Sequence, residues 1–189
     1  MKKPFAIGIA GGTCSGKSTL ADQLNEALGS KYKVTLINMD HYFKRPGITT
    51  IAPITGIEYV EHNHPDAMRV DDMVADFEAA VTPGEDAADI VIIEGLFALY
   101  LAPIREKLDL KIFVDLASDE RLVRRIDKFM ARGQTKKEVT DRYIDTVRFR
   151  HNELIEPTRW HADLVLNGVF DRTKAEEIVV TYVEAKLNG

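Results

Sequence analysis

A glycine-rich segment between an apolar run and an amphipathic run constrains this chain more than any other feature. Residues 11–18 read Gly-Gly-Thr-Cys-Ser-Gly-Lys-Ser, which satisfies the pattern G-x-x-x-x-G-K-[ST]. The preceding residues 5–10 are continuously apolar, as in a buried strand, and residues 17–28 place leucines four apart, as in a helix. The sequence therefore predicts a strand, a glycine-rich loop and a helix in direct succession, a unit of α/β folds.

Four further short apolar runs resemble the first one, and helical patterns separate them. Their continuous, β-branched character suits strands of a parallel sheet that is covered on both faces. At 189 residues the chain is long enough for one domain and too short for two ordinary ones. We predict a single α/β domain over residues 1–189, a P-loop three-layer fold with a five-stranded parallel sheet and a small helical lid near 124–137. The four further strands are expected at 33–38, 89–94, 110–115 and 162–167.

Helix signals occur at four other places. Apolar positions at helical spacing fill residues 68–81, and Ser118 is a candidate N-cap for the next helix. Thr135 and Glu138 form a capping-box pattern, and the helix after it is expected to turn Val139, Tyr143 and Val147 toward the core. A last helix is expected from near Thr173 to Lys186.

Composition excludes several classes of protein. The single cysteine, Cys14, rules out an internal disulfide framework and suits a reducing compartment. No apolar run approaches the ~20 residues of a membrane span, and the apolar stretch near the start is too short for a signal peptide. We therefore expect a cytoplasmic protein. The net charge of −5 argues against nucleic acid or a membrane surface as a partner and leaves a small-molecule substrate.

The glycine-rich loop predicts a nucleoside triphosphate as its ligand. Glycines let backbone N–H groups curl around phosphate oxygens, and the following helix N-terminus favours negative charge. Lys17 is expected to neutralise the β- and γ-phosphates, and Ser18 to bind Mg²⁺. The base-reading string N-K-x-D of guanine-nucleotide switches is absent from the sequence, which favours ATP. The expected nucleotide-binding residues of the loop are Gly11, Gly12, Thr13, Cys14, Ser15, Gly16, Lys17, Ser18 and Thr19.

Two carboxylates follow predicted strands. Glu94 ends the run 89–94, which is expected beside the first strand, so its carboxylate would face the magnesium ion. Asp40 lies two residues past the second strand, where an acid could take the proton of an attacking hydroxyl and also contribute to the metal site. Ordinary turn chemistry is the alternative for Asp40. Beside the loop and Glu94, the catalytic interpretation is favoured.

A basic window follows the fourth predicted strand. Residues 121–142 hold eight basic and three acidic side chains, a local net charge of +5. Arg124, Arg125 and Arg132 fall on or near one helix with Gly133 as a hinge, which suits a lid over transferring phosphates. Arg124 is expected to act in catalysis, and Arg125 and Arg132 to bind the nucleotide. The alternative for each is a solvated helix face.

Residues 43–65 show no clear period and contain three prolines, two glycines and two histidines. Long irregular segments in small domains are usually functional, and this one follows the second strand, at the edge where such sheets bind ligands. The spacing of His62 and His64 is not a convincing zinc signal. From this segment Phe43, Tyr59, Asn63 and His64 are expected to contact the substrate, together with Asp40 and Arg124.

Six segments in order along nearly the whole chain resemble the uridine kinase branch of the P-loop kinases. They are GGTCSGKST, MDHYF, HNHPDA, IIEGLFAL, FVDLASDERLVRRI and IEPTRWHADLVL. The resemblance implies transfer of the ATP γ-phosphate to the 5′-hydroxyl of a nucleoside, uridine or cytidine. It makes Asp40 the base, places Ser18 and Glu94 on Mg²⁺, and assigns Arg124 and Arg125 to phosphates or substrate and Arg132 to the lid.

The sequence departs from that family in three places. Asn63 stands where the family has an aspartate that holds the ribose, and Gln134 replaces an arginine of a lid that is one residue shorter. The stretch from Asp66 to Glu94 lacks the hairpin that reads the pyrimidine. Nicotinamide riboside or another hydroxylated metabolite is therefore an alternative acceptor, and a regulatory module that binds ATP without transfer is an alternative function. Members of the family often form oligomers, so a homo-oligomer is also compatible with the resemblance.

Overall fold

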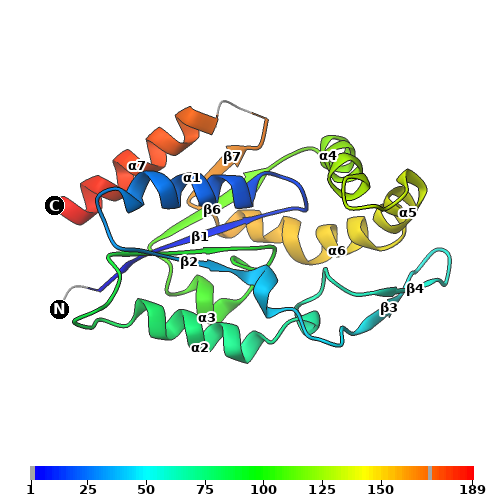
Figure 1. The fold of residues 1–189 in the computed structure, drawn as a ribbon, viewed down its shortest axis with the longest axis horizontal. Coiled ribbons are helices and arrows are strands. Elements are labelled where there is room, and N and C mark those ends of the chain that lie inside the picture. The colour runs from blue at the N-terminus through cyan, green and yellow to red at the C-terminus, as the bar shows by residue number, and fades with distance from the viewer. Residues whose placement is uncertain (1–2, 170–171) are drawn as a thin grey trace.

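Strands and helices alternate along the chain and build one parallel sheet between two helical layers (Figure 1). The computed structural model describes residues 3–169 and 172–189. The main sheet has the order β2-β5-β1-β6-β7, with every neighbouring pair parallel. Its strands are β1 (Phe5–Gly11), β2 (Val34–Asn38), β5 (Ile90–Glu94), β6 (Leu110–Asp115) and β7 (Leu164–Asn167). The predicted fold class and all five predicted strands are confirmed.

Each face of the sheet is covered by its own helices (Figure 1). On one face lie α1 (Lys17–Gly29) and α7 (Arg172–Asn188), and on the other α2 (Val70–Val81) and α3 (Ala102–Arg105). Side chains along β1 alternate between the two apolar clusters: Ile7 belongs to the cluster with α1, and Ala6 to the cluster with α2. Both faces being buried explains why the strands read as continuous apolar runs.

The register of the sheet brings three chain segments to one edge. Ile9 of β1 and Asn38 of β2 both pair with Glu94 of β5. The loop after β1, the residue that ends β5 and the turn after β2 therefore meet at the carboxyl edge of the sheet. This is the edge at which open parallel sheets bind ligands.

A second group of elements extends beyond this edge. The helix α4 (Ser118–Met130) is followed by α5 (Lys136–Arg142), whose start carries the predicted capping box between Thr135 and Glu138. Ser118 is the first helical residue, and Ala117 occupies the cap position without a side-chain hydrogen bond. The chain continues helically from α5 through η3 (Tyr143–Val147), α6 (Arg148–Arg150), η4 (His151–Ile155) and η5 (Glu156–His161).

The expectation of a wholly irregular segment at 43–65 is wrong. The segment contains an antiparallel hairpin of β3 (Thr49–Ile51) and β4 (Glu58–Val60), which projects beside α5 and α6 (Figure 1). It is preceded by η1 (Met39–Tyr42) and followed by η2 (Pro65–Ala67). Strands of three residues are too short to show an alternating pattern, so no periodic signal marks them in the sequence. None of the helices in the described ranges has the length and apolar character to cross a membrane.

Candidate active site

The glycine-rich loop closes around the start of α1 through left-handed backbone. Gly16 has φ 107° and Cys14 has φ 59°, a region that glycine enters freely and other residues rarely enter. A side chain at Gly11 would collide with the Val114 carbonyl, because a Cβ there would lie 2.5 Å from that oxygen. The loop thus leads directly into the N-terminus of a 13-residue helix at Lys17. Its backbone is arranged as an anion-binding turn.

Ser18 and Glu94 form the oxygen pair expected for a magnesium site. The Ser18 hydroxyl donates to Glu94 Oε2 at 3.1 Å. Burial raises the pKa of Glu94 most strongly, Lys17 lowers it, and the negative charge of Asp40 raises it further. A cation would relieve this cost of burying the carboxylate. Among the described residues no three acidic, histidine or cysteine side chains cluster to hold a metal. A hydroxyl and a carboxylate fit Mg²⁺, because this ion takes few protein ligands and completes its shell with phosphate and water.

Asp40 lies at the mouth of a cavity of about 370 Å³. Its backbone N–H donates to Asn38 Oδ1 at 2.8 Å, which fixes the turn after β2. The exposed carboxylate lines the same cavity as Lys17, so the predicted base and the predicted phosphate-binding lysine share one space. The full lining is Thr13, Cys14, Lys17, Asp40, Phe43, His62, Asn63, Leu96, Arg125, Lys128, Phe129, Arg132, Gln134 and Arg142.

A second cavity of about 210 Å³ lies on the outer side of the glycine-rich loop. We call it the donor cavity, and the larger one the acceptor cavity, after the roles that we propose for them below. Three residues line both cavities, namely Cys14, Lys17 and Lys128. The remaining lining of the donor cavity is Gly16, Ser18, Thr19 and Arg124. The loop lysine therefore stands at the boundary between the two spaces.

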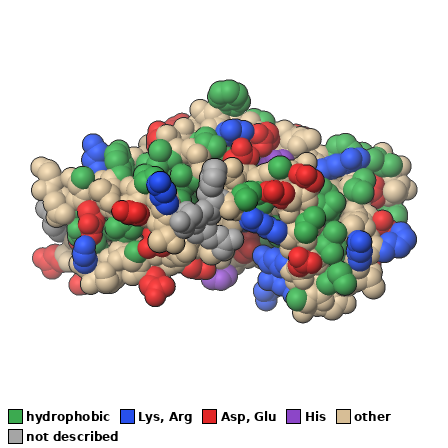
Figure 2. Space-filling view, turned by 90° about the horizontal axis from the view of Figure 1, so that it is seen from above, with side chains coloured by type: hydrophobic (Ala, Val, Ile, Leu, Met, Phe, Trp, Pro, Cys, Tyr) green, Lys and Arg blue, Asp and Glu red, His purple; other side chains and the backbone are tan. Residues whose placement is uncertain are grey.

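The three predicted lid arginines do not all line the same cavity. Arg124 lines the donor cavity and donates to the Gly168 carbonyl at 3.0 Å. Arg125 lines the acceptor cavity, donates to Thr13 Oγ1 at 2.9 Å and packs its guanidinium 4.4 Å from the Phe129 ring centre. Arg132 is exposed, also lines the acceptor cavity, and places its guanidinium 5.5 Å from the centre of the same ring. Basic side chains gather around α4 and α5, toward the right of Figure 2.

Of the predicted substrate contacts, Asp40, Phe43 and Asn63 line the acceptor cavity, and Tyr59, His64 and Arg124 are not part of its lining. Tyr59 lies under the Arg142 guanidinium, 5.8 Å from ring centre to carbon. His64 accepts a hydrogen bond from the Asp66 N–H at 3.2 Å and so supports η2. Direct substrate contact stays a prediction for all six residues.

Residues 61–175 match the phosphoribulokinase / uridine kinase family. A protein named uridine kinase from Halobacterium salinarum is 32% identical, over 98% of this chain and 87% of its own length. Another, from Lactobacillus helveticus, is 29% identical over 100% of this chain and 98% of its own. The chain belongs to the phosphoribulokinase / uridine kinase family. The solved structure of shikimate kinase from Acinetobacter baumannii has the same fold, with a TM-score of 0.56 at 16% identity over 97% of this chain and 94% of that one.

Arg142 is a residue of the site that the sequence does not reveal. In the sequence it is only one charge of the basic window, because it lies beyond Arg132 on a separate helix. The structure turns it into the acceptor cavity, where its guanidinium lies 3.0 Å from His62 Nδ1. His62 in turn meets the Phe43 ring edge-on, at 5.1 Å between centres. No spacing pattern could have found this contact, since it joins segments 80 residues apart.

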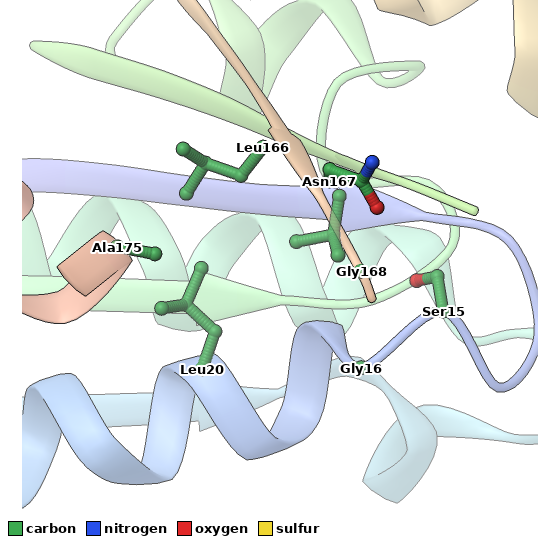
Figure 3. Close-up of a pocket in the computed structure, with 8 residues that line it drawn as sticks. Ser15, Gly16, Leu20, Leu166, Asn167, Gly168 and Ala175 are labelled. Carbon is green, nitrogen blue, oxygen red and sulfur yellow. The ribbon is translucent and has the colours of Figure 1, made fainter. Parts of the chain in front are cut away.

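A third, small cavity lies behind the glycine-rich loop (Figure 3). Its volume is about 30 Å³, room for about one water molecule. Ser15 and Gly16 of the loop face Leu166, Asn167 and Gly168 at the end of β7 across it (Figure 3). A Cβ on Gly168 would lie 2.3 Å from the Ser15 carbonyl. This small cavity is therefore a gap in the close packing between the loop and the end of β7, and it is not a substrate site.

Proposed function

We propose that the protein is an ATP-dependent kinase that transfers the γ-phosphate to the 5′-hydroxyl of a nucleoside, with uridine or cytidine as the first acceptors to test. One observation carries the proposal: Lys17 of the glycine-rich loop and Asp40 line a single cavity. A phosphate held by the loop and a hydroxyl held at Asp40 would therefore share one space.

The donor half would bind the triphosphate. Backbone N–H groups of residues 11–19 would surround the phosphate oxygens, with Lys17 as the cationic partner of the β- and γ-phosphates. Ser18 and Glu94 would hold Mg²⁺, which supplies charge neutralisation at the β- and γ-oxygens when bound. Arg124 faces this half and would act on phosphates rather than on the acceptor.

The acceptor half would orient the hydroxyl and remove its proton. Asp40 would accept the proton as the hydroxyl oxygen forms its bond to the γ-phosphorus and the bond to the ADP oxygen breaks. The backbone N–H of Asn63 donates to Glu61 Oε1 at 2.6 Å, which holds this residue in place. The side-chain amide of Asn63 would bind the ribose hydroxyls. Phe43 would pack against the base.

Residues of about 124–137 would act as the lid. This stretch joins the end of α4 to the start of α5, with Gly133 at φ 90° between them. Arg125 and Arg132 lie along it and line the acceptor cavity, so closure would bring positive charge to the transferring phosphate. Water would be excluded at the same time.

Nicotinamide riboside or another hydroxylated metabolite is a second candidate acceptor. One observation favours it: between Asp66 and Glu94 the structure has η2, α2 and a connecting loop, and no strand precedes β5 among these described residues. The hairpin that would read a pyrimidine is therefore absent from that stretch. A regulatory module that only binds ATP is disfavoured, because it would need no acid at Asp40. We further propose a cytoplasmic location and leave a homo-oligomer as compatible with the family.

The test is ADP release from Mg-ATP with uridine, cytidine, nicotinamide riboside, pantothenate and ribulose 5-phosphate, using Asp40→Asn as the blank. Turnover that rises with uridine or cytidine supports the proposal in full. A signal with a different acceptor keeps the kinase and changes its substrate. Equal ADP release with and without every acceptor would refute the kinase.

A further inference from the structure

Arg142 lines the acceptor cavity as a partly buried cation whose bonding capacity is not used up. Its Nη2 donates to the Val60 carbonyl and contacts His62 Nδ1. Its Nε is buried and has no hydrogen-bond partner within residues 3–169 and 172–189. Burial lowers the pKa of this guanidinium, yet an arginine stays protonated in proteins. The hydrogen bonds that Arg142 makes within the described residues use Nη2, and Nη1 is not among the buried atoms, so Nη1 is left to donate to an oxygen atom of a ligand in the cavity.

The nearest acid does not serve as its counter-ion. Glu61 raises the pKa of Arg142 through space, but its carboxylate is committed elsewhere. It accepts from Arg150 Nε at 3.2 Å and from the Asn63 N–H at 2.6 Å. The ion pairs found in the described part of the chain do not include Arg142. The positive charge of Arg142 is therefore left facing the cavity.

The charge of the cavity has two separate sources. Five basic residues and one carboxylate, Asp40, line it. Lys17 and Lys128 also line the donor cavity, and Arg125 is bonded to Thr13 of the loop, so a triphosphate accounts for these three. Arg132 is exposed, so water can solvate its charge. Arg142 instead contacts β4 and the residues after it, on the acceptor side. A triphosphate on the loop does not account for this cation.

We propose that Arg142 is a specificity-determining residue: it binds an oxygen-acceptor group of the molecule that receives the phosphate, and it prefers a carboxylate or phosphate ester to a neutral group. The inference rests on the proposed kinase function and deepens its acceptor site. A guanidinium offers donors only, and its bonds to anions are about twice as strong as neutral ones. A uracil carbonyl meets the requirement, whereas the positively charged ring of nicotinamide riboside is repelled.

The first test uses inorganic phosphate as the probe. The enzyme is saturated with Mg²⁺ and the non-hydrolysable analogue AMP-PNP, so that the glycine-rich loop is filled, and phosphate binding is measured by calorimetry. We expect the wild-type protein to bind phosphate and Arg142→Gln to bind it at least about tenfold more weakly. Lys136→Gln is the matched control, because it removes one positive charge from an exposed position on the same helix, outside the cavity lining. No binding by wild type, or equal binding by Arg142→Gln, overturns the proposal.

The second test compares two acceptors of the same size, nicotinate riboside and nicotinamide riboside, which differ in a carboxylate against an amide. We expect the wild-type kcat/KM to favour the carboxylate, and Arg142→Gln to lower that preference about tenfold. Arg142→Lys keeps the charge and should keep part of the preference, and thermal unfolding of each variant checks the fold. An equal loss for both acceptors would assign Arg142 to the transition state or the fold, and would overturn the proposal. ADP release that no acceptor stimulates defeats the proposed function instead, and the phosphate titration then decides the role of Arg142 alone.

Discussion

The donor and acceptor halves of this site are built in different ways. The donor half comes mainly from one contiguous stretch, residues 14–19, completed by Arg124 and Lys128 of α4 and by Glu94 from the neighbouring strand. The acceptor half is formed by side chains of the segment 40–63 together with side chains of α4, α5 and the turn between these helices. A site made by one loop is recognisable in the sequence as a motif, whereas a site made by distant segments depends on how those segments dock.

The forces that hold the two halves also differ. The glycine-rich loop is held by the register of β1 with β5 and β6 and by close backbone packing. The hairpin β3–β4 is held by polar contacts with the helices beyond it. Thr55 donates to the buried Asp145, Arg142 to the Val60 carbonyl, and Arg150 to Glu61. The acceptor half should therefore respond to single polar substitutions at a distance from the cavity, and the donor half should not.

The largest expected effect is that of Asp40→Asn, which tests whether the two halves divide binding from chemistry. We expect turnover to fall about 10²–10⁴-fold, the usual contribution of a positioned base. The affinity for Mg-ATP should stay near that of the wild type, because the loop and Ser18 are unchanged. Steady-state kinetics and calorimetry with AMP-PNP measure the two quantities. Unimpaired turnover in this variant would remove Asp40 as the base.

Lys17→Ala tests the donor half directly. We expect kcat/KM for ATP to fall about 10²–10³-fold, because an electrostatic partner of the transferring phosphate is lost. The same kinetic assay, with ATP varied and the acceptor saturating, measures this loss. Thr19 also lines the donor cavity, and Thr19→Ser is a mild control that keeps its hydroxyl. Nearly normal ATP kinetics in Lys17→Ala would contradict a phosphate role for this lysine.

Arg150→Gln tests whether the acceptor half depends on its polar anchors. The substitution leaves Glu61 buried without its cation, and Glu61 holds the backbone of Asn63. We expect the acceptor KM to rise about tenfold, with an unfolding free energy lower by about 1–3 kcal/mol. The KM for ATP should not change. These are measured by kinetics with each substrate varied in turn and by denaturant unfolding.

The control for this variant is Lys107→Gln, which breaks an ion pair with Glu78 away from the site. Both partners of that pair are half-exposed, and such pairs contribute about 0–1 kcal/mol. Its kinetics should match the wild type. If Arg150→Gln also left the acceptor KM unchanged, the hairpin would not be held through Glu61.

The smallest expected effect is on stability against pH and concerns His151 in η4. Burial, and secondarily Arg121, lowers the pKa of His151 from 6.5 to about 4, and these effects outweigh the contact of its Nε2 with the half-exposed Glu156 Oε2 at 3.1 Å. Below pH 6.5 the unfolded chain thus binds more protons than the folded one, so this residue makes the protein less stable as pH falls toward 4. At 1.36 kcal/mol per pKa unit the loss is at most about 3 kcal/mol. His151→Gln should reduce the loss of unfolding free energy between pH 7 and pH 5, measured in urea.

The exposed His161 provides the matched control, since His161→Gln should leave the pH dependence unchanged. In the donor half, Glu94 changes the stability of the protein with pH in the opposite direction. Because burial raises its pKa above 4.5, the folded state binds the extra proton, and this carboxyl's contribution to stability falls as pH rises above that value. If His151→Gln lost more unfolding free energy than the wild type between pH 7 and pH 5, the lowered pKa of His151 would be contradicted.

Much of the fold and the donor half was predictable from sequence because the signals are local. Continuous apolar runs gave the five parallel strands, and the pattern over residues 11–18 gave the loop between β1 and α1. The capping box at Thr135 and Glu138 gave the start of α5. The pairing of Ser18 with Glu94 followed from two strand ends that had to meet at one edge of the sheet.

The sequence by itself determined a parallel α/β sheet, its glycine-rich loop and the two acids at the sheet edge, since each depends on residues adjacent in the chain or on neighbouring strands. Only the tertiary structure decided that residues 49–60 form a hairpin, that Arg124 and Arg125 line different cavities, and that Arg142 faces the acceptor space. These features depend on contacts between segments far apart in the chain. Such contacts are set by packing and burial of the whole molecule and leave no periodic trace in the sequence.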